Sequence, residues 1–244
     1  MPMKASRLLL VSALALSSSA VLTSFRLADS DEKPARNMRE VPAFTRLALG
    51  NSARVVLRQG SPQRVEVEAS AADQQWLETT VKGNQLRIGT RSEQSKPRWH
   101  QFEGPVVVYI TMPVVTGLSV NGSGKLKAET DIKTDKLDVA MNGPGGLELH
   151  GVQAAELETS LNGSGEVLLG GNCPRHDASI NGSGAVRAGK LRSETASVSI
   201  HGSGDAHIYA TKTLKATVVG SGDVYVGGGA QVSSTTIGSG RVRQ

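Results

Sequence analysis

The sequence predicts an all-β fold, a right-handed parallel β-helix (β-solenoid) with repeats of about 20 residues, preceded by a region of less regular strands. Three observations predict it. A Gly-Ser-Gly motif recurs at nearly constant spacing, apolar and polar residues alternate on both sides of each motif, and aromatic residues make up only 3% of the 244-residue chain. Aromatic rings contribute much of the core of ordinary globular domains. A core built from Val, Leu, Ile and Ala therefore favours thin, repeated layers.

Residues 1–20 are predicted to be a signal peptide. Lys4 and Arg7 form a positively charged start, and an apolar stretch follows. Small residues near its end suit signal peptidase, so we place the cleavage after Ala20, with a site near Ser24 as the alternative. An uncleaved membrane anchor is the competing interpretation, but the apolar stretch is short for a membrane span. We therefore expect bacterial export to the periplasm, the cell envelope or the medium, with no stable membrane span after cleavage.

The rest of the chain is predicted to be a linker followed by one domain. Residues 21–42 are assigned to a flexible linker, because residues 29–42 are polar and charged with two prolines. Less regular strands over 43–117 and repeat coils over 118–244 form the domain. Residues 47–57 match 118–128 position by position, so they are expected to form one further coil. The remaining strands of the region are expected to cover the open end of the stack.

Each repeat is defined by its corner. The first glycines of seven related tetrapeptides stand at positions 122, 143, 163, 182, 202, 220 and 238, so the steps are 21, 20, 19, 20, 18 and 18 residues. Glycine adopts positive φ without a steric penalty, which suits a sharp bend between two strands. The glycines that we assign to the structural corner are Gly122, Gly124, Gly163, Gly165, Gly182, Gly184, Gly202, Gly204, Gly220, Gly222, Gly238 and Gly240.

The segments that flank each corner are predicted to be strands. Apolar residues stand four and two positions before the first glycine, as at Leu118 and Val120, and four and six positions after it, as at Leu126 and Ala128. This period of two is typical of half-buried strands. A two-strand unit cannot bury its inner face alone, so we expect the units to stack.

An asparagine precedes the first glycine in four successive repeats. In a stack with constant register, these side chains lie above one another and their amides can hydrogen-bond from coil to coil. The predicted structural ladder consists of Asn121, Asn142, Asn162 and Asn181. The residue at this position is His201 in the next repeat and is apolar in the last two, so the ladder is expected to stop partway.

Charge and cysteine content exclude several classes of protein. The formal net charge is +5, but the chain has no Lys/Arg block and no basic stripe interleaved with aromatic residues. That footprint is needed for nucleic-acid binding, which we therefore do not expect. Cys173 is the one cysteine. It cannot form an intrachain disulfide or a multi-cysteine metal site. We interpret it as an incidental small residue in a loop between repeats, with an intermolecular disulfide in an oxidising compartment as the alternative.

No group of residues predicts catalysis, a cofactor or a metal ion. Asp205 and Asp223 are the best acidic candidates because they hold the same repeat position, but other repeats carry Lys, Gly, Glu, Ala or Arg there. A paired-acid mechanism needs two carboxylates without neutralising neighbours, so we interpret the two as surface charges. His176, His201 and His207 lack an identifiable further zinc ligand. Calcium-binding Gly-rich repeats have a nine-residue period, about half of the period found in this chain, so we do not expect calcium binding.

Several motifs in a fixed order resemble a known family. The motifs are Phe44-x-x-Leu47-x-Leu49, then Val55-x-Leu57-x-Gln59-Gly60, then Met112-Pro113 ahead of Leu118-x-Val120-x-Gly122-Ser123-Gly124, and finally the serial Gly-Ser-Gly corners. Over about residues 42–242 the chain is similar to the head GIN domain of autotransporter adhesins, a bacterial family. The resemblance implies an exported β-helix with an adhesin-like function, and it transfers no catalytic residue.

These observations predict a non-enzymatic, exported binding or adhesin-like module with a repetitive surface. The expected partner is a ligand of the cell envelope or of another surface, whose identity the sequence leaves open. A structural protein of the cell envelope is the alternative, and a carbohydrate-active β-helix enzyme is a further one. Arg241 and Arg243 place charges on the last strand, which discourages edge-to-edge pairing. We therefore expect a monomer or a small oligomer.

Overall fold

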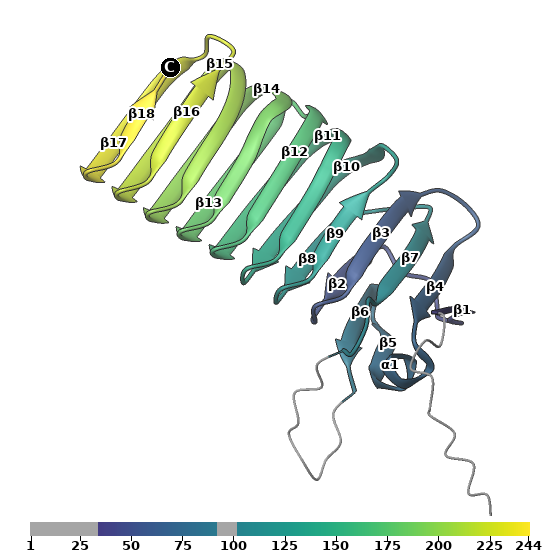
Figure 1. The fold of residues 1–244 in the computed structure, drawn as a ribbon. Helices are drawn as coiled ribbons and strands as arrows, with labels where there is room; N and C mark the ends of the chain where they lie inside the picture. Colours follow the sequence, from purple (N-terminus) through teal and green to yellow (C-terminus); the bar gives the residue numbers. More distant parts are fainter. Residues whose placement is uncertain (1–33, 92–101) are drawn as a thin grey trace, which may run out of the picture. The chain divides into compact units, whose positions relative to one another are not determined.

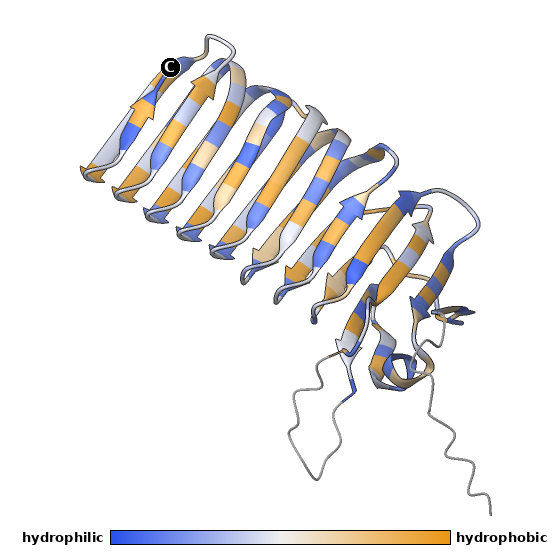
Figure 2. Cartoon of the chain, viewed as in Figure 1, coloured by the Kyte–Doolittle hydropathy of each residue, from blue (hydrophilic) through white to orange (hydrophobic). Residues whose placement is uncertain are grey.

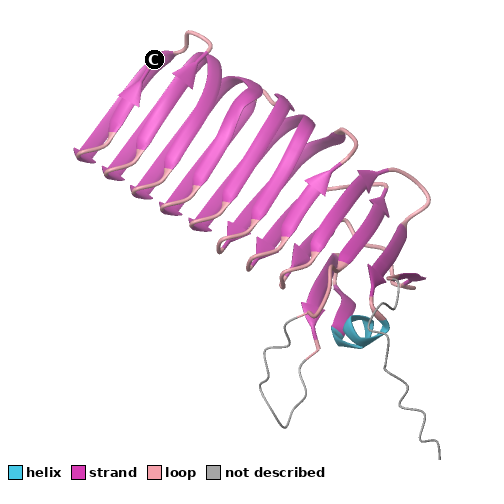
Figure 3. Ribbon diagram, viewed as in Figure 1, coloured by secondary structure: helices cyan, strands magenta, loops and turns pink. Residues whose placement is uncertain are grey.

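The computed structural model describes residues 34–91 and 102–244. They form a β-solenoid of stacked parallel coils with about six turns (Figure 1). Strands account for nearly all of the regular structure, and Figure 3 shows one short helix beside them. The predicted fold class is therefore confirmed. The predicted signal peptide with Ala20, and the linker up to residue 33, lie outside the described residues.

The coils present two main faces, which we name by the length of their strand segments. The long face carries the segments that run into each corner: β6 (Gln85–Thr90), β2 (Arg46–Leu49), β8 (Gly117–Asn121), β10 (Ile132–Asn142), the second part of β11 (Gly146–Gly163), β13 (Arg175–Gly182), the second parts of β14 (Ala185–Gly202) and β15 (Asp205–Gly220), and β17 (Gln231–Gly238). Neighbouring segments pair in parallel, so equivalent residues of successive repeats lie side by side.

The short face carries the segments that leave each corner. These are β7 (Val107–Met112), β3 (Arg54–Gln59), β9 (Lys125–Ala128), the first part of β11, β12 (Glu166–Asn172), the first parts of β14 and β15, β16 (Asp223–Gly227) and β18 (Arg241–Arg243). Because β11, β14 and β15 continue around the bend from one face to the other, the backbone forms one continuous 18-stranded sheet.

The N-terminal strands extend the stack in an order that differs from the chain order. Leu47 pairs with Leu118 and Val55 pairs with Leu126, so residues 47–57 form the coil that the sequence match predicts. The next coil outward consists of β6 and β7, which come later in the chain but pair with β2 and β3. Strands that are distant in sequence are therefore neighbours in the stack.

Antiparallel strands close this end of the solenoid. On the long face β5 (Leu77–Lys82) pairs with β6, and on the short face β4 (Arg64–Ala69) pairs with β7. The short helix α1 (Ala71–Trp76) joins β4 to β5. The change from parallel to antiparallel pairing interrupts the repeat, so a further identical coil has no matching strand edge to pair with at this end. The expectation that these strands cover the open end is thus confirmed.

The prediction of a flexible linker is wrong for residues 35–38. Within the range 21–42, β1 (Ala35–Met38) pairs antiparallel with β4. The side chains of β1 are exposed, so no apolar pattern marked the segment as a strand. Its order comes from backbone hydrogen bonds to the free edge of β4 and from the ion pair of Arg36 with Glu68 at 2.9 Å.

The core is a set of inward-facing aliphatic rows. Leu126, Leu147, Val167 and Val186 occupy one such row and are each almost fully buried. Figure 2 shows the corresponding alternation of hydrophobic and hydrophilic residues along each strand. Burying a side chain of this size stabilises the fold by about 1.5–3 kcal/mol. No helix in the described ranges is long and apolar enough to span a membrane.

The two glycines of each corner are needed for different physical reasons. The first glycine has a φ between 118° and 129° in all seven corners, including Gly143, which our corner assignment left out. Side chains are strained in that region. The second glycine is limited by contact with the preceding coil. A Cβ atom on Gly165 would lie 2.7 Å from the carbonyl oxygen of Gly143.

Candidate ligand-binding surface

The outward side chains of the long face form straight columns. Constant register places equivalent residues next to each other at the strand spacing of about 4.8 Å. The column three residues before the first glycine of each corner is dominated by hydroxyl groups, and we name it the hydroxyl column. Its members are Ser119, Ala140, Ser160, Ser179, Ser199, Thr217 and Thr235. The face therefore repeats one hydrogen-bonding group, coil after coil, along a line.

The asparagines form a second column next to the corner. Asn142 donates from Nδ2 to Oδ1 of Asn121 at 2.8 Å, Asn162 donates to Asn142 at 2.9 Å, and Asn181 donates to Asn162 at 2.9 Å. Asn121 in turn donates to the hydroxyl of Ser119 at 2.9 Å, which joins the ladder to the hydroxyl column. Each amide thus has a fixed orientation on an exposed surface.

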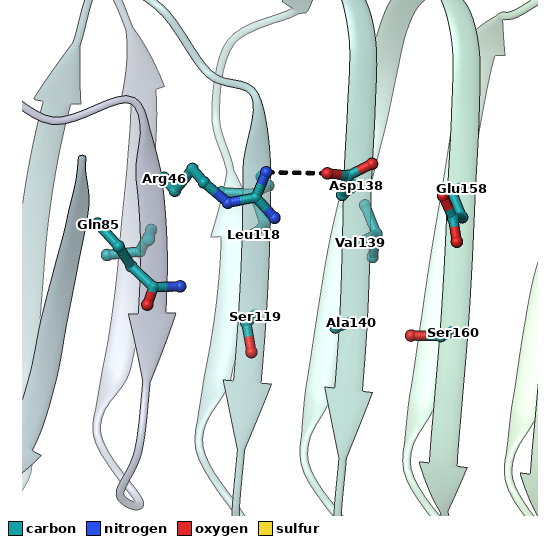
Figure 4. Close-up of a pocket in the computed structure, with 11 residues that line it drawn as sticks. Arg46, Gln85, Leu118, Ser119, Asp138, Val139, Ala140, Glu158 and Ser160 are labelled. Atoms are coloured by element: carbon teal, nitrogen blue, oxygen red, sulfur yellow. Dashed lines mark hydrogen bonds and ion pairs between the residues drawn. The ribbon is translucent and has the colours of Figure 1, made fainter. Parts of the chain in front are cut away.

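An ion pair crosses the N-terminal part of the long face. Arg46 Nη1 lies 2.8 Å from Oδ2 of Asp138, although these residues are on β2 and β10 with β8 between them (Figure 4). The guanidinium passes over Gly117, where a Cβ atom would lie 2.5 Å from Cζ of Arg46. The missing side chain of β8 therefore allows the arginine to reach the second coil.

A shallow depression lies beside this ion pair. It has a volume of about 190 Å³, and polar groups of Gln85, Ser119, Glu158 and Ser160 line it with Arg46 and Asp138 (Figure 4). Enclosed small-molecule pockets usually measure about 300–1,000 Å³. This depression is better suited to one unit of an extended ligand that lies along the face.

The two acidic candidates lie on the short face, on neighbouring coils as their repeat position indicates. The backbone N–H of Asp223 donates to Oδ1 of Asp205 at 3.0 Å, and that of Arg241 donates to Oδ1 of Asp223 at 2.9 Å. Arg243 lies 3.2 Å from Oδ2 of Asp223. Each carboxylate therefore holds the backbone of the following coil, and Asp223 has a neutralising neighbour. This arrangement favours a structural role.

The three histidine candidates are not brought together. His176 faces the core with 1% exposure and lies 3.2 Å from Thr159 Oγ1, and burial lowers its pKa to about 4. His201 continues the asparagine column. His207 stacks on Tyr225 on the short face, with ring centroids 4.6 Å apart. Across residues 34–91 and 102–244, no three His, Cys, Asp or Glu side chains form a metal-binding group.

Cys173 lies between β12 and β13 and points inward. Its side chain is fully buried and donates to the carbonyl oxygen of Arg175 at 3.0 Å. Burial raises the pKa of the thiol to about 11. Since the thiolate is the reactive form, this cysteine is unreactive in the folded protein.

The hydroxyl column was not predicted, although the sequence contains a signal for it. Ser or Thr stands three positions before the first glycine in six of the seven repeats, with Ala140 as the exception. The contact of Arg46 with Asp138 had no such signal. The two residues are 92 positions apart in the chain, and the repeat pattern shows which residues share a column but not how far a side chain reaches across it.

Comparisons with known proteins agree with this architecture. Residues 43–230 match the family model described as “Putative auto-transporter adhesin, head GIN domain”. A “putative adhesin” from Bacteroides fragilis has a TM-score of 0.77 at 23% identity, covering 87% of this chain and 97% of the other. A “putative lipid binding protein” from Parabacteroides distasonis has a TM-score of 0.74 at 22% identity, with 87% and 97% covered.

A third solved structure, a “putative adhesin” from Parabacteroides merdae, has a TM-score of 0.66 at 21% identity, with 87% and 96% covered. At such identities the similarity shows the fold and not the ligand. No curated protein matches the chain significantly. The family match spans most of the chain and includes six of the seven corners that shape the solenoid. The protein therefore belongs to the family described as “Putative auto-transporter adhesin, head GIN domain”.

Proposed function

We propose that the protein is a non-enzymatic, exported adhesin-like module that binds an extended ligand along its long face. The hydroxyl column carries this proposal, because it repeats one polar group at one position per coil. A linear array of this kind can hydrogen-bond a polymer with a repeating hydroxyl or amide pattern. Ligands of that chemistry include polysaccharides of the cell envelope or of another cell surface.

The neighbouring asparagine ladder supports the same function. An amide that is held by its neighbours loses little conformational freedom when a ligand binds, so less of the interaction energy is lost to ordering. The family to which the chain belongs is described as “Putative auto-transporter adhesin, head GIN domain”, in agreement with a binding role. Asp205 and Asp223, the acids best placed for an enzymatic reaction, each already accept a hydrogen bond from a backbone N–H of the next coil, and Asp223 is also paired with Arg243.

A binding screen tests the proposal. The exported protein is applied to an array of envelope glycans, matrix proteins and lipid vesicles, and saturable binding to a polymeric ligand is the expected result. Ser179→Arg places a bulky charge in the middle of the hydroxyl column and is expected to weaken binding about tenfold or more, since loss of about 1.4 kcal/mol is a factor of ten.

Ala185→Arg is the matched control, because Ala185 lies on the short face a few residues further along the chain. This variant is expected to bind like the unmodified protein. Absence of any saturable ligand for the folded protein, or equal losses in the two variants, argues against a binding function of the long face.

A further inference from the structure

Two positive charges lie directly opposite each other on the short face. Arg54 on β3 pairs in register with Lys125 on β9, and both side chains are exposed. Like charges at such positions repel and destabilise a sheet. Neighbouring cations have carboxylate partners, as Arg58 does in Glu129 at 2.7 Å. Within the described residues, no ion pair involves Arg54 or Lys125.

The next coil leaves open space beside this pair. Gly146 follows Lys125 in the column, and a Cβ atom on Gly146 would meet only Cγ of Lys125, at 3.7 Å. The surface is hollowed here to about 480 Å³, and Arg54, Lys125 and Gly146 line the depression together with the corner residues Pro144 and Ser164. We name this depression the basic hollow.

The two carboxylates that line the basic hollow have cation partners. Glu148 lies 3.8 Å from Nζ of Lys127, and Glu166 is paired with Arg187. These carboxylates are therefore already engaged by cations of their own face. The excess positive charge of the hollow belongs to Arg54 and Lys125.

We propose that the basic hollow binds the anionic group of an acidic saccharide, a carboxylate or phosphate carried on a sugar ring. The guanidinium of Arg54 matches the two oxygens of such a group, and the ammonium of Lys125 adds a second positive charge. The volume is much larger than an oxyanion needs and lies within the usual range of small-molecule pockets. A sugar ring therefore fits in the space above Gly146.

Other lining groups suit a sugar. Ser164 provides a hydroxyl that both donates and accepts hydrogen bonds, and the half-exposed Leu168 provides an apolar contact for the carbon-bonded face of a ring. The site goes beyond the proposed function, because it lies on the short face and uses no residue of the hydroxyl column.

Isothermal titration calorimetry of the exported full chain tests the proposal. The probes are a galacturonic acid oligomer, glucose 1-phosphate, inorganic phosphate and a neutral maltose oligomer. We expect binding of the galacturonate oligomer or of the sugar phosphate, weaker binding of inorganic phosphate and none of the neutral oligomer. Added salt is expected to weaken the binding, because exposed charges are screened.

Two variants separate a specific site from general charge attraction. The double variant Arg54→Gln with Lys125→Gln removes the cations, and Gly146→Leu fills the hollow while the charge stays unchanged. The φ of Gly146 is not in the positive region, so leucine is compatible with the backbone. Each change is expected to weaken binding about tenfold or more, as expected for loss of a charge-assisted hydrogen bond or its geometry.

The matched control is Lys82→Gln with Lys190→Gln, which removes the same charge from exposed residues that belong neither to the basic hollow nor to the hydroxyl column, and it is expected to leave binding unchanged. Three results would overturn the inference: no binding of either acidic saccharide, inorganic phosphate binding as tightly as both, or equal binding by the Gly146→Leu variant. Circular dichroism verifies that each variant is folded. The Ser179→Arg test concerns the opposite face, so either proposal can fail while the other stands.

Discussion

Asn142 donates a hydrogen bond to Asn121 at 2.8 Å and accepts one from Asn162, so that a single side chain links three coils of the solenoid. The donor and acceptor of the first bond are 21 residues apart in the chain. The relationship repeats because each coil places its corner at the same height in the register. It also makes the ladder sensitive to the loss of one member.

Replacing Asn142 by alanine is expected to destabilise the protein by about 1–2 kcal/mol, since it removes two exposed hydrogen bonds, each worth about 0.5–1.5 kcal/mol. Urea denaturation measures the change in the free energy of unfolding. Val219→Ala is the control, because Val219 holds the same column beyond the ladder. Its side chain is partly exposed, so a small effect is expected. Equal losses in the two variants would show that the ladder contributes nothing of its own.

Replacing Gly143 by alanine is expected to cost about 2 kcal/mol or more. Its φ is 118°, and a Cβ atom would lie 2.9 Å from the carbonyl oxygen of Gly122. Gly189→Ala provides the contrast, because this glycine has ordinary φ and its Cβ would meet only His207 at 4.0 Å. That change is expected to be neutral or slightly stabilising. Thermal unfolding of both variants checks the difference, and a mild effect at Gly143 contradicts the account of the corner.

Stability is expected to fall as the pH decreases from about 6.5 to about 4 because of His176. Burial lowers its pKa from 6.5 to about 4, so the unfolded chain binds a proton in this window and the folded protein does not. The contribution of neutral His176 to the free energy of unfolding is complete above pH 6.5, and about 3 kcal/mol of this free energy is lost at pH 4.

The His176 prediction is checked by measuring the free energy of unfolding across this range. His176→Leu, which keeps an apolar side chain in the core, is expected to flatten the pH dependence. An unchanged slope in that variant would assign the effect to other groups.

Cys173 is expected to resist thiol reagents in the native protein. Its side chain is buried and the pKa of its thiol is raised to about 11, so almost no thiolate is present at neutral pH. Labelling with a disulfide reagent is expected to be slow in buffer and rapid in denaturant. Fast labelling of the folded protein would mean that the loop between β12 and β13 opens readily.

Much of the repeat could be derived from the sequence because the strands and the bend of each coil have their own local sequence pattern. The alternation at Leu118 and Val120 identifies an inward-facing row, and the glycine at 122 identifies the bend that follows. Equal spacing then implies the register, and the register implies which side chains share a column. The interpretation of 35–38 as linker failed for the opposite reason, since β1 has no buried side chain and depends on the edge of β4 alone.

The sequence by itself determined the two strands of each coil, the glycine corner between them and the residues that share a column. All three follow from local periodicity and from the conformational freedom of glycine. Only the tertiary structure decided which coil β6 and β7 occupy, how Arg46 reaches Asp138 across Gly117, and where Gly146 leaves space beside Arg54 and Lys125. These features depend on side-chain reach and on pairing between segments far apart in the chain. No local pattern encodes such distances, so they become visible only when the coils are stacked.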